Sequence, residues 1–324
     1  MSAQSHGLAT HDVSPSAPPD VPKKRQGFPV AYWYLLPVAI SALLFTVIPF
    51  FYTFYISFTN YHRVFRSQEF DFIGLDNYRR ALSSGGEFFP VLGWTFAFMF
   101  ITTLLNVGGG MLLALMLNHD RMVERNFYRT ILIIPWALPS ILTIQVWAGM
   151  FGLSGPINLV LQNLGFERVR WFLEEGSARS ALLMTNFWLS YPFFMTVGLA
   201  ALQAIPRDLY EVADLDGAGT WNKFKDITWP FLIASVTPLL LTQLAFQFNN
   251  AGVIVLLTNG DPQAYPGSRH GVTDTLASFA YKLINEQGAG DMGYAAAYGV
   301  FTFFIIAIFI ILTARATNAF KEID

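Results

Sequence analysis

Six long stretches of this 324-residue chain contain no Asp, Glu, Lys or Arg, and they constrain the fold more than any other feature. A bilayer-spanning helix needs about 20 apolar residues, and a Lys or Asp at its centre costs about 2.5–3.5 kcal/mol. The pattern therefore predicts an all-α integral membrane protein with six transmembrane helices. Their apolar centres lie near residues 31–57, 91–117, 129–151, 179–204, 230–257 and 292–314.

Composition excludes several other classes of protein. Charged residues make up 13% of the chain, whereas soluble domains carry roughly 25%. The net charge of −2 argues against a nucleic-acid partner. Because the chain has no cysteine, disulfides, thiolate metal sites and cysteine nucleophiles are excluded.

The chain divides into a short polar head and a long apolar body. Residues 1–27 are rich in Ser, Pro and His and show no apolar period, so we expect a disordered tail. Residues 28–324 form the predicted transmembrane domain. The basic run Lys23-Lys24-Arg25 stands directly before the first span and favours a cytoplasmic N-terminus. Six spans then place the C-terminus on the cytoplasmic side as well.

Several kinds of chemistry have no support in the sequence. There is no G-x-x-x-x-G-K-[ST] phosphate loop and no H-E-x-x-H pair. The predicted spans also lack the buried charges that ion-coupled carriers usually keep. A transporter of this kind would take its energy from another subunit. The alternatives are an ion-coupled secondary sugar carrier of six spans, whose sodium sites could use carbonyls alone, and an intramembrane enzyme.

Glycines and prolines inside the predicted spans are expected to affect how the helices pack and bend. Gly108-Gly109-Gly110 in the second span permits close helix contact. Prolines free backbone carbonyls and permit kinks. They occur inside spans at positions 135, 139, 192 and 238.

The fourth connection, residues 205–229, predicts two short helices at an angle. Pro206 suits a first helical turn, and Gly217 can end that helix in the left-handed conformation. Thr220 can cap a second helix, which Pro230 would close. Two interpretations remain: a docking surface for a soluble partner, or an amphipathic interfacial linker.

The run Glu211-Val212-Ala213-Asp214-Leu215-Asp216-Gly217-Ala218, followed by Phe224, Ile227 and Pro230, resembles a known motif. It is similar to the cytoplasmic E-A-A-x-x-x-G motif of permease subunits from binding-protein-dependent ABC importers, with Val212 in place of the usual first Ala. The resemblance implies a coupling helix that inserts into a cleft on an ATPase subunit. The implied coupling residues are Glu211, Ala213, Asp216, Gly217 and Ala218.

Two further segments, Phe246–Asn250 and Leu257–Pro262, resemble MalF-like permeases of the maltose-type subfamily. The similarity runs from Trp33 to the C-terminus. It implies the type I ABC importer permease fold in a bacterial inner membrane. It also implies four partners: a homologous MalG-like permease, two ATPase subunits and an extracytoplasmic sugar-binding protein. ATP and Mg²⁺ would bind to the ATPase subunits, so this chain would be neither an enzyme nor a cofactor carrier.

Polar side chains line one face of the fourth and fifth spans with the spacing i, i+3, i+4, i+7. The two sets are Asn186, Leu189, Ser190 and Phe193, and Gln243, Phe246, Gln247 and Asn250. Amides match sugar hydroxyls as donors and acceptors, and a Phe ring covers the apolar face of a pyranose. The alternative interpretation is that these polar residues join neighbouring helices.

The resemblance maps maltose-type sugar contacts onto both sets. Three residues depart from the family pattern: Ser190 stands where Gly is usual, Phe193 where Tyr is usual and Gln247 where Asn is usual. These changes predict altered hydrogen bonding to maltose itself. The predicted substrate is a disaccharide or a short malto-oligosaccharide.

Overall fold

The computed structural model describes residues 31–62, 70–83, 86–119, 122–285 and 290–316, so the predicted tail of residues 1–27 lies outside the described residues. The chain forms two compact units, residues 1–49 and 50–324. The described part of the first unit contains α1 (Ala31–Ala42) and a π-helical turn, η1 (Leu43–Val47). Helix α2 (Ile48–Ile56) begins at the end of this unit.

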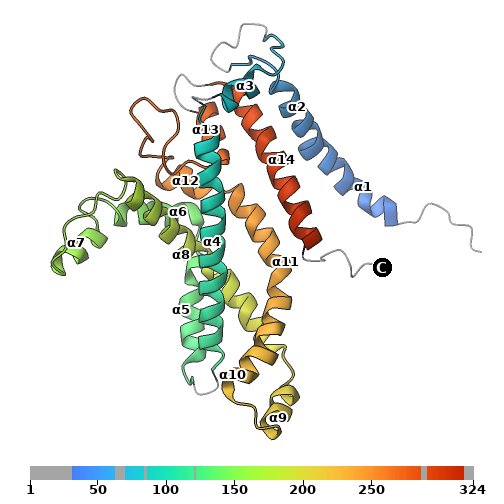
Figure 1. Ribbon diagram of the computed structural model, residues 1–324, viewed down its shortest axis with the longest axis vertical. Helices are drawn as coiled ribbons and strands as arrows, with labels where there is room; N and C mark the ends of the chain where they lie inside the picture. Colours follow the sequence, from blue (N-terminus) through green and yellow to red (C-terminus); the bar gives the residue numbers. More distant parts are fainter. Residues whose placement is uncertain (1–30, 63–69, 84–85, 120–121, 286–289, 317–324) are drawn as a thin grey trace, which may run out of the picture. The chain divides into compact units, whose positions relative to one another are not determined.

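The regular structure of the second unit is helical (Figure 1), and its described residues form isolated β-bridges but no extended strand, as the all-α prediction requires. Its remaining helices are α3 (Asp76–Leu82), α4 (Phe88–Leu117), α5 (Arg125–Ala137), α6 (Ser140–Met150), α7 (Pro156–Asn163), α8 (Glu175–Gln203), α9 (Arg207–Leu215), α10 (Thr220–Lys223), the π-helical turn η2 (Phe224–Thr228), α11 (Trp229–Phe248), α12 (Gly252–Leu257), α13 (Leu276–Asn285) and α14 (Met292–Ala316).

Five described helical segments are long and apolar enough to cross a membrane, or six if a bent pair of helices counts as one span. The five segments are Tyr32–Ile56, Phe88–Leu117, Glu175–Gln203, Thr220–Phe248 and Met292–Thr313. The bent pair is α5 with α6, and the angle between the two helices is 96°. The third predicted span is therefore not a straight helix.

Pro139 explains where the bent pair breaks. The residue before a proline is driven out of the helical region by the pyrrolidine ring. Leu138 accordingly has extended backbone angles, with φ −89° and ψ 145°, and ends α5. Pro139 then begins α6 and accepts the Thr143 N–H at its carbonyl oxygen, 3.1 Å away.

The start of the fifth span differs from the sequence prediction. Thr220 is the first residue of α10 rather than its cap, and Pro230 ends no helix. Instead, η2 joins α10 to α11 and the helix runs on unbroken. The π-type bond from the Trp229 N–H to the Phe224 carbonyl adds one residue to the turn, so the proline ring fits within a continuous helix.

The fifth span is also shorter at its far end than predicted. Helix α11 ends at Phe248, and Asn249 has bridge-region backbone angles. The Asn250 side chain donates to the Gln247 side-chain oxygen, and its backbone N–H donates to the Gln247 carbonyl. These local bonds compete with continuation of the helix, and α12 follows as a separate short helix.

Close contact between α4 and α8 forms the centre of the second unit. A Cβ at Gly110 would lie 2.5 Å from the Phe194 Cβ, and one at Gly198 would lie 2.8 Å from the Ala114 Cβ. Only glycine permits this approach, so the expectation of close packing at Gly108–Gly110 is met at Gly110. A Cβ at Gly108 would meet nothing within 4 Å.

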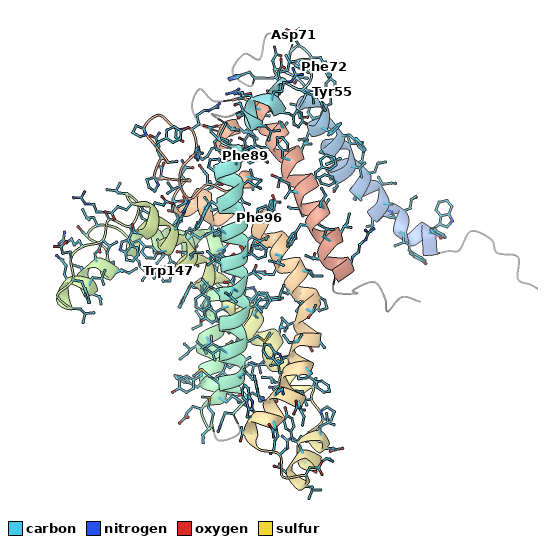
Figure 2. All side chains as sticks on the ribbon, in the orientation of Figure 1. Tyr55, Asp71, Phe72, Phe89, Phe96 and Trp147 are labelled. Carbon is cyan, nitrogen blue, oxygen red and sulfur yellow. The ribbon has the colours of Figure 1, made fainter. Side chains whose placement is uncertain are left out.

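The two ends of the second unit carry different structures. Helices α9 and α10 lie at one end, and α3 and α13 lie at the other, with α4 running between them (Figure 1). Near the α13 end, α4, α11, α13 and α14 share an apolar core. In Figure 2, Phe96 projects from α4 on this side, and its ring lies 5.3 Å from that of Phe248.

Candidate functional site

Helix α9 carries the motif residues and ends in a well-formed cap. Gly217 has φ +73°, which favours glycine. Its N–H donates to the Asp214 carbonyl over 3.1 Å, and the Ala218 N–H donates to the Ala213 carbonyl over 2.9 Å. These two bonds are the Schellman arrangement, so Gly217 ends α9 as its sequence predicts.

The motif residues lie on an exposed surface, which we call the ledge and define as residues 207–221. Glu211, Asp216 and Gly217 are exposed, while Ala213 and Ala218 are half-buried. Apolar side chains are exposed beside them: Leu215 is 88% exposed and Trp221 70%. Exposed apolar groups next to carboxylates are typical of a surface that binds another protein.

Two side-chain contacts attach the ledge to the base of α11. The Tyr210 hydroxyl lies 2.8 Å from that of Thr228 in η2. Lys223 of α10 forms an ion pair with Asp214 of α9. Because both contacts cross from α9 to the continuous helix Thr220–Phe248, the ledge and that helix are mechanically joined.

The structure brings part of the two polar stripes into direct contact. Asn186 of α8 and Gln247 of α11 are both buried and form a reciprocal amide pair. The Asn186 Nδ2 donates to the Gln247 Oε1, and the Gln247 Nε2 donates to the Asn186 Oδ1, each over 3.2 Å. The Asn250 Nδ2 also donates to the Gln247 Oε1, over 3.0 Å. The Asn186–Gln247 pair makes the interhelical bonds that the alternative interpretation expected, and Asn250 adds a local bond to it.

The other members of the stripes are not in this amide network. Phe246 is 61% exposed, and Leu189, Ser190 and Phe193 are half-buried. The Phe193 ring lies 6.0 Å from that of Trp136 on α5. The Gln243 Nε2 is buried and has no hydrogen-bond partner. An aromatic ring and an unpaired amide donor on one helix face are the groups that a sugar site uses, although the Gln243 donor is buried in this conformation.

Asn106 belongs to the network, and sequence analysis missed it. Its Nδ2 donates to the Asn186 Oδ1 over 3.0 Å, which extends the network to α4. The available signal was that Asn106 is the single Asn or Gln in residues 88–117. One isolated amide shows no stripe, so periodicity alone could not select it.

A second polar cluster lies where α4 and α8 begin. The Arg179 guanidinium lies over the Trp94 ring, 4.1 Å from its centroid, and its Nε donates to the Val272 carbonyl over 3.0 Å. Arg179 also forms an ion pair with Glu175. A cavity of about 140 Å³ opens here, and residues of the 258–275 loop complete its lining. Arg179 and Trp94 thus fix this loop to two long helices.

Asp274 of the same loop forms a buried ion pair with Lys282 of α13. The Lys282 Nζ lies 2.9 Å from the Asp274 Oδ2, which also accepts the Gly271 N–H. Burial raises the pKa of the Asp274 carboxyl, and the Lys282 charge partly offsets this rise. Gly260 is required beside it, because a Cβ there would lie 2.2 Å from the Asp274 Oδ1.

His270 lies in the same cluster. Burial lowers its pKa, whereas the charges of Glu87 and Asp274 act to raise it and that of Lys282 to lower it. The Ser268 hydroxyl donates to the His270 carbonyl over 2.6 Å, and the His270 Nδ1 lies 3.0 Å from the same hydroxyl oxygen. A depressed pKa keeps the ring neutral near pH 7.

Comparison with known families decides the assignment. The profile of the family described as "Binding-protein-dependent transport system inner membrane component" matches residues 106–321. The chain belongs to this family. Membership agrees with the multi-pass membrane architecture and with the expectation of a transport component rather than an enzyme.

Relatives within the family are maltose/maltodextrin transport system permease proteins MalF. Those of Klebsiella aerogenes and Escherichia coli K12 are each 38% identical to this chain, over 252 and 251 residues. Each alignment covers 76% of this chain and 49% of the relative. The chain therefore spans about half the length of the curated relatives it matches. The family resemblance found in the sequence is confirmed.

Solved structures support the fold of an inner membrane component. A chain in the crystal structure of a bacterial ABC transporter involved in the import of the acidic polysaccharide alginate superposes with a TM-score of 0.75. It is 23% identical, and the match covers 90% of this chain and 95% of that one. The same transporter in complex with a periplasmic protein bound to an alginate pentasaccharide gives a TM-score of 0.71. The type I ABC permease fold is therefore confirmed.

Proposed function

We propose that this chain is a transmembrane permease subunit of an ATP-driven sugar importer and forms half of its translocation pathway. One observation carries the proposal. The unbroken helix Thr220–Phe248 joins the exposed ledge at one end to the amide network and Phe246 at the other. A ligand-binding face and a partner-binding face on one rigid element are what a coupled transporter needs.

The proposed complex contains four further subunits. They are a MalG-like permease, two ATPase subunits and an extracytoplasmic sugar-binding protein. The ATPase subunits hold ATP and Mg²⁺. In this scheme both termini of the chain and the ledge lie on the cytoplasmic side of the inner membrane. The cluster of Arg179, Trp94 and the 258–275 loop then lies outside, where the binding protein delivers sugar.

The transport cycle follows from coupling between the two faces. The ledge residues Glu211, Ala213, Asp216, Gly217 and Ala218 dock on an ATPase subunit. ATP-driven closure of the ATPase pair moves the ledge and turns the pathway outward, and hydrolysis returns it inward. Sugar promotes this cycle only because it binds the two states with different affinity.

The proposed substrate is a disaccharide or short malto-oligosaccharide. The stripe of the fifth span offers both parts of a sugar site: the exposed Phe246 ring and the amides of Gln243 and Asn250. The relatives' transport of maltose and maltodextrin, as their names state, supports this class. The family assignment does not favour the ion-coupled secondary carrier.

Reconstitution tests the proposed function. The chain is assembled with the proposed MalG-like permease and ATPase subunits, placed in liposomes with the binding protein, and supplied with radiolabelled maltose and maltotriose. We expect uptake that requires both ATP and the binding protein. Uptake by the chain alone with an ion gradient would contradict the proposal and support a secondary carrier.

A further inference from the structure

Asn106 is buried within the helix bundle, but its amide is only half satisfied. Its side chain is 0% exposed. The Nδ2 donates to the Asn186 Oδ1 over 3.0 Å, whereas the Oδ1 has no hydrogen-bond partner. Native proteins leave few buried polar atoms unpaired. A half-satisfied amide costs more than an apolar side chain of the same shape, so stability alone does not explain an amide here.

The bonds around Asn186 show what the Asn106 amide does. A carbonyl oxygen accepts two hydrogen bonds. The Asn186 Oδ1 accepts one from Asn106 and one from Gln247. The Gln247 Oε1 likewise accepts two, from Asn186 and Asn250. Both oxygens are therefore saturated, and donors from α4 and from the end of α11 hold the central amide pair in one orientation.

Removing the Asn106 donor would let the Asn186 amide leave that orientation. Without it, the Asn186 Oδ1 keeps a single partner, and the amide can rotate about its last side-chain bond at little cost. The free N–H groups of Asn186 and Gln247 would then point in several directions. A sugar that depends on their direction would bind less tightly, because it would have to order them first.

We propose that Asn106 is a positioning residue of the sugar site, which acts through Asn186 and Gln247. The inference rests on the proposed sugar-import function and deepens it. It assigns to α4 a part in substrate recognition that the stripes of α8 and α11 alone did not include. Thr103 provides a contrast on the same helix: its hydroxyl is also buried and unpaired, but it bonds to no member of the network.

The test uses the full importer in proteoliposomes with radiolabelled maltose. Asn106→Leu keeps the shape and removes the donor, and we expect it to raise KM by about tenfold while Vmax falls by less. Asn106→Ser is the second variant in case the first fails to assemble, and the same rise is expected. Thr103→Val is the control and should leave KM unchanged.

A double-mutant cycle separates positioning from simple packing. If Asn106 acts through Asn186, Asn106→Leu should raise KM no further in an Asn186→Leu background. An unchanged KM in both Asn106 variants, or fully additive effects in the double-mutant cycle, overturns this inference. The proposed function is unaffected by that result as long as the wild type still takes up maltose. Absence of ATP-dependent maltose uptake by the wild type overturns both.

Discussion

Phe246 and Gln247 are adjacent in the chain but differ in their exposure to solvent. Phe246 projects from α11 with 61% of its surface exposed, whereas Gln247 is fully buried. One stripe therefore contains a residue free to touch a ligand and another that holds helices together. Gln247 thus makes the helix-to-helix contact that one interpretation of the stripe expected, whereas sugar contact at Phe246 stays a prediction.

Phe246→Ala tests the exposed member. Because the ring covers little of this chain, its removal leaves no cavity in the bundle, and folding should be retained. If the ring covers the sugar, we expect KM for maltose uptake to rise about tenfold, as loss of one aromatic contact implies. Sugar-independent ATP hydrolysis should persist, since the ATPase subunits perform it.

The control is Phe304→Ala, which removes an exposed ring from α14 instead. It should leave uptake kinetics as in the wild type. If the two variants have the same KM for uptake, Phe246 does not contact the sugar and its role is packing.

Sequence periodicity located the stripe residues but not their partners. Spacing along one helix shows which residues share a face, and it placed Asn186 in one stripe and Gln247 in the other without predicting that they pair. It carries no information about which residue of a third helix meets them. Asn106 therefore appeared only when α4 was placed against α8.

At the level of the element, the end of α9 depends on the backbone of one residue. Gly217 has φ +73°, and a Cβ there would meet nothing within 4 Å. A side chain at this position would project into the open space that the proposed ATPase cleft occupies.

Gly217→Asp should therefore abolish sugar-stimulated ATP hydrolysis while the chain remains inserted. The new side chain would place a negative charge in the proposed docking surface. It would also add about 1 kcal/mol of backbone strain at this positive φ. Stimulated ATPase rates of the reconstituted complex measure the effect.

Gly165→Asp is a closely matched control. Gly165 ends α7 with the same pattern of capping bonds, has φ +87° and also faces open space. The strain and the added charge are alike, but the position is not on the ledge. If both variants lose stimulation equally, strain rather than docking is the cause.

A second element-level prediction concerns the contact of α4 with α8. Gly110→Val would place a Cβ 2.5 Å from that of Phe194 and force the helices apart. Overpacking of this kind costs about 1–3 kcal/mol, so we expect a lower unfolding temperature in detergent. Gly108→Val, on the same helix but facing no neighbour, should change it little; an equal loss would mean that helix propensity, not contact, is responsible.

The sequence predicted that the long helices exist, but it did not predict correctly where each of them breaks. Runs without charge predicted each long segment because a bilayer selects them by length and polarity. Pro139 and Pro230 are the same residue type, yet Pro139 lies at the break between two helices 96° apart and Pro230 lies inside an unbroken helix. The π-helical turn that accommodates Pro230 depends on tertiary packing, which a single sequence does not display.

On the scale of the whole second unit, the proposed cycle requires that movement of the ledge reach the amide network. The Tyr210–Thr228 hydrogen bond and the Asp214–Lys223 ion pair are the side-chain links between α9 and the helix that begins at Thr220. The ion pair is largely exposed on the Asp214 side and contributes little. The hydroxyl pair is the stronger candidate for transmission.

Tyr210→Phe removes that bond and keeps the ring. We expect fewer sugars transported per ATP hydrolysed, by about twofold to tenfold, because α9 can move without α11. Transport and ATPase rates measured on the same proteoliposomes give the ratio. Tyr281→Phe, which alters an exposed hydroxyl on α13, should leave the ratio as it is; an equal fall there would indicate a general loss of integrity.

The unbroken helix Thr220–Phe248 has 29 residues and is about 43 Å long. Tilting its inner end swings Gln247 away from Asn186, and two amide bonds of 3.2 Å each do not survive a shift of an ångström or more. In the proposed cycle, the movement that opens the pathway would also expose these amides to an incoming sugar. In the proposed cycle, sugar hydroxyls that arrive at that moment would replace the broken partners, so an open empty site would cost more free energy than an open filled one.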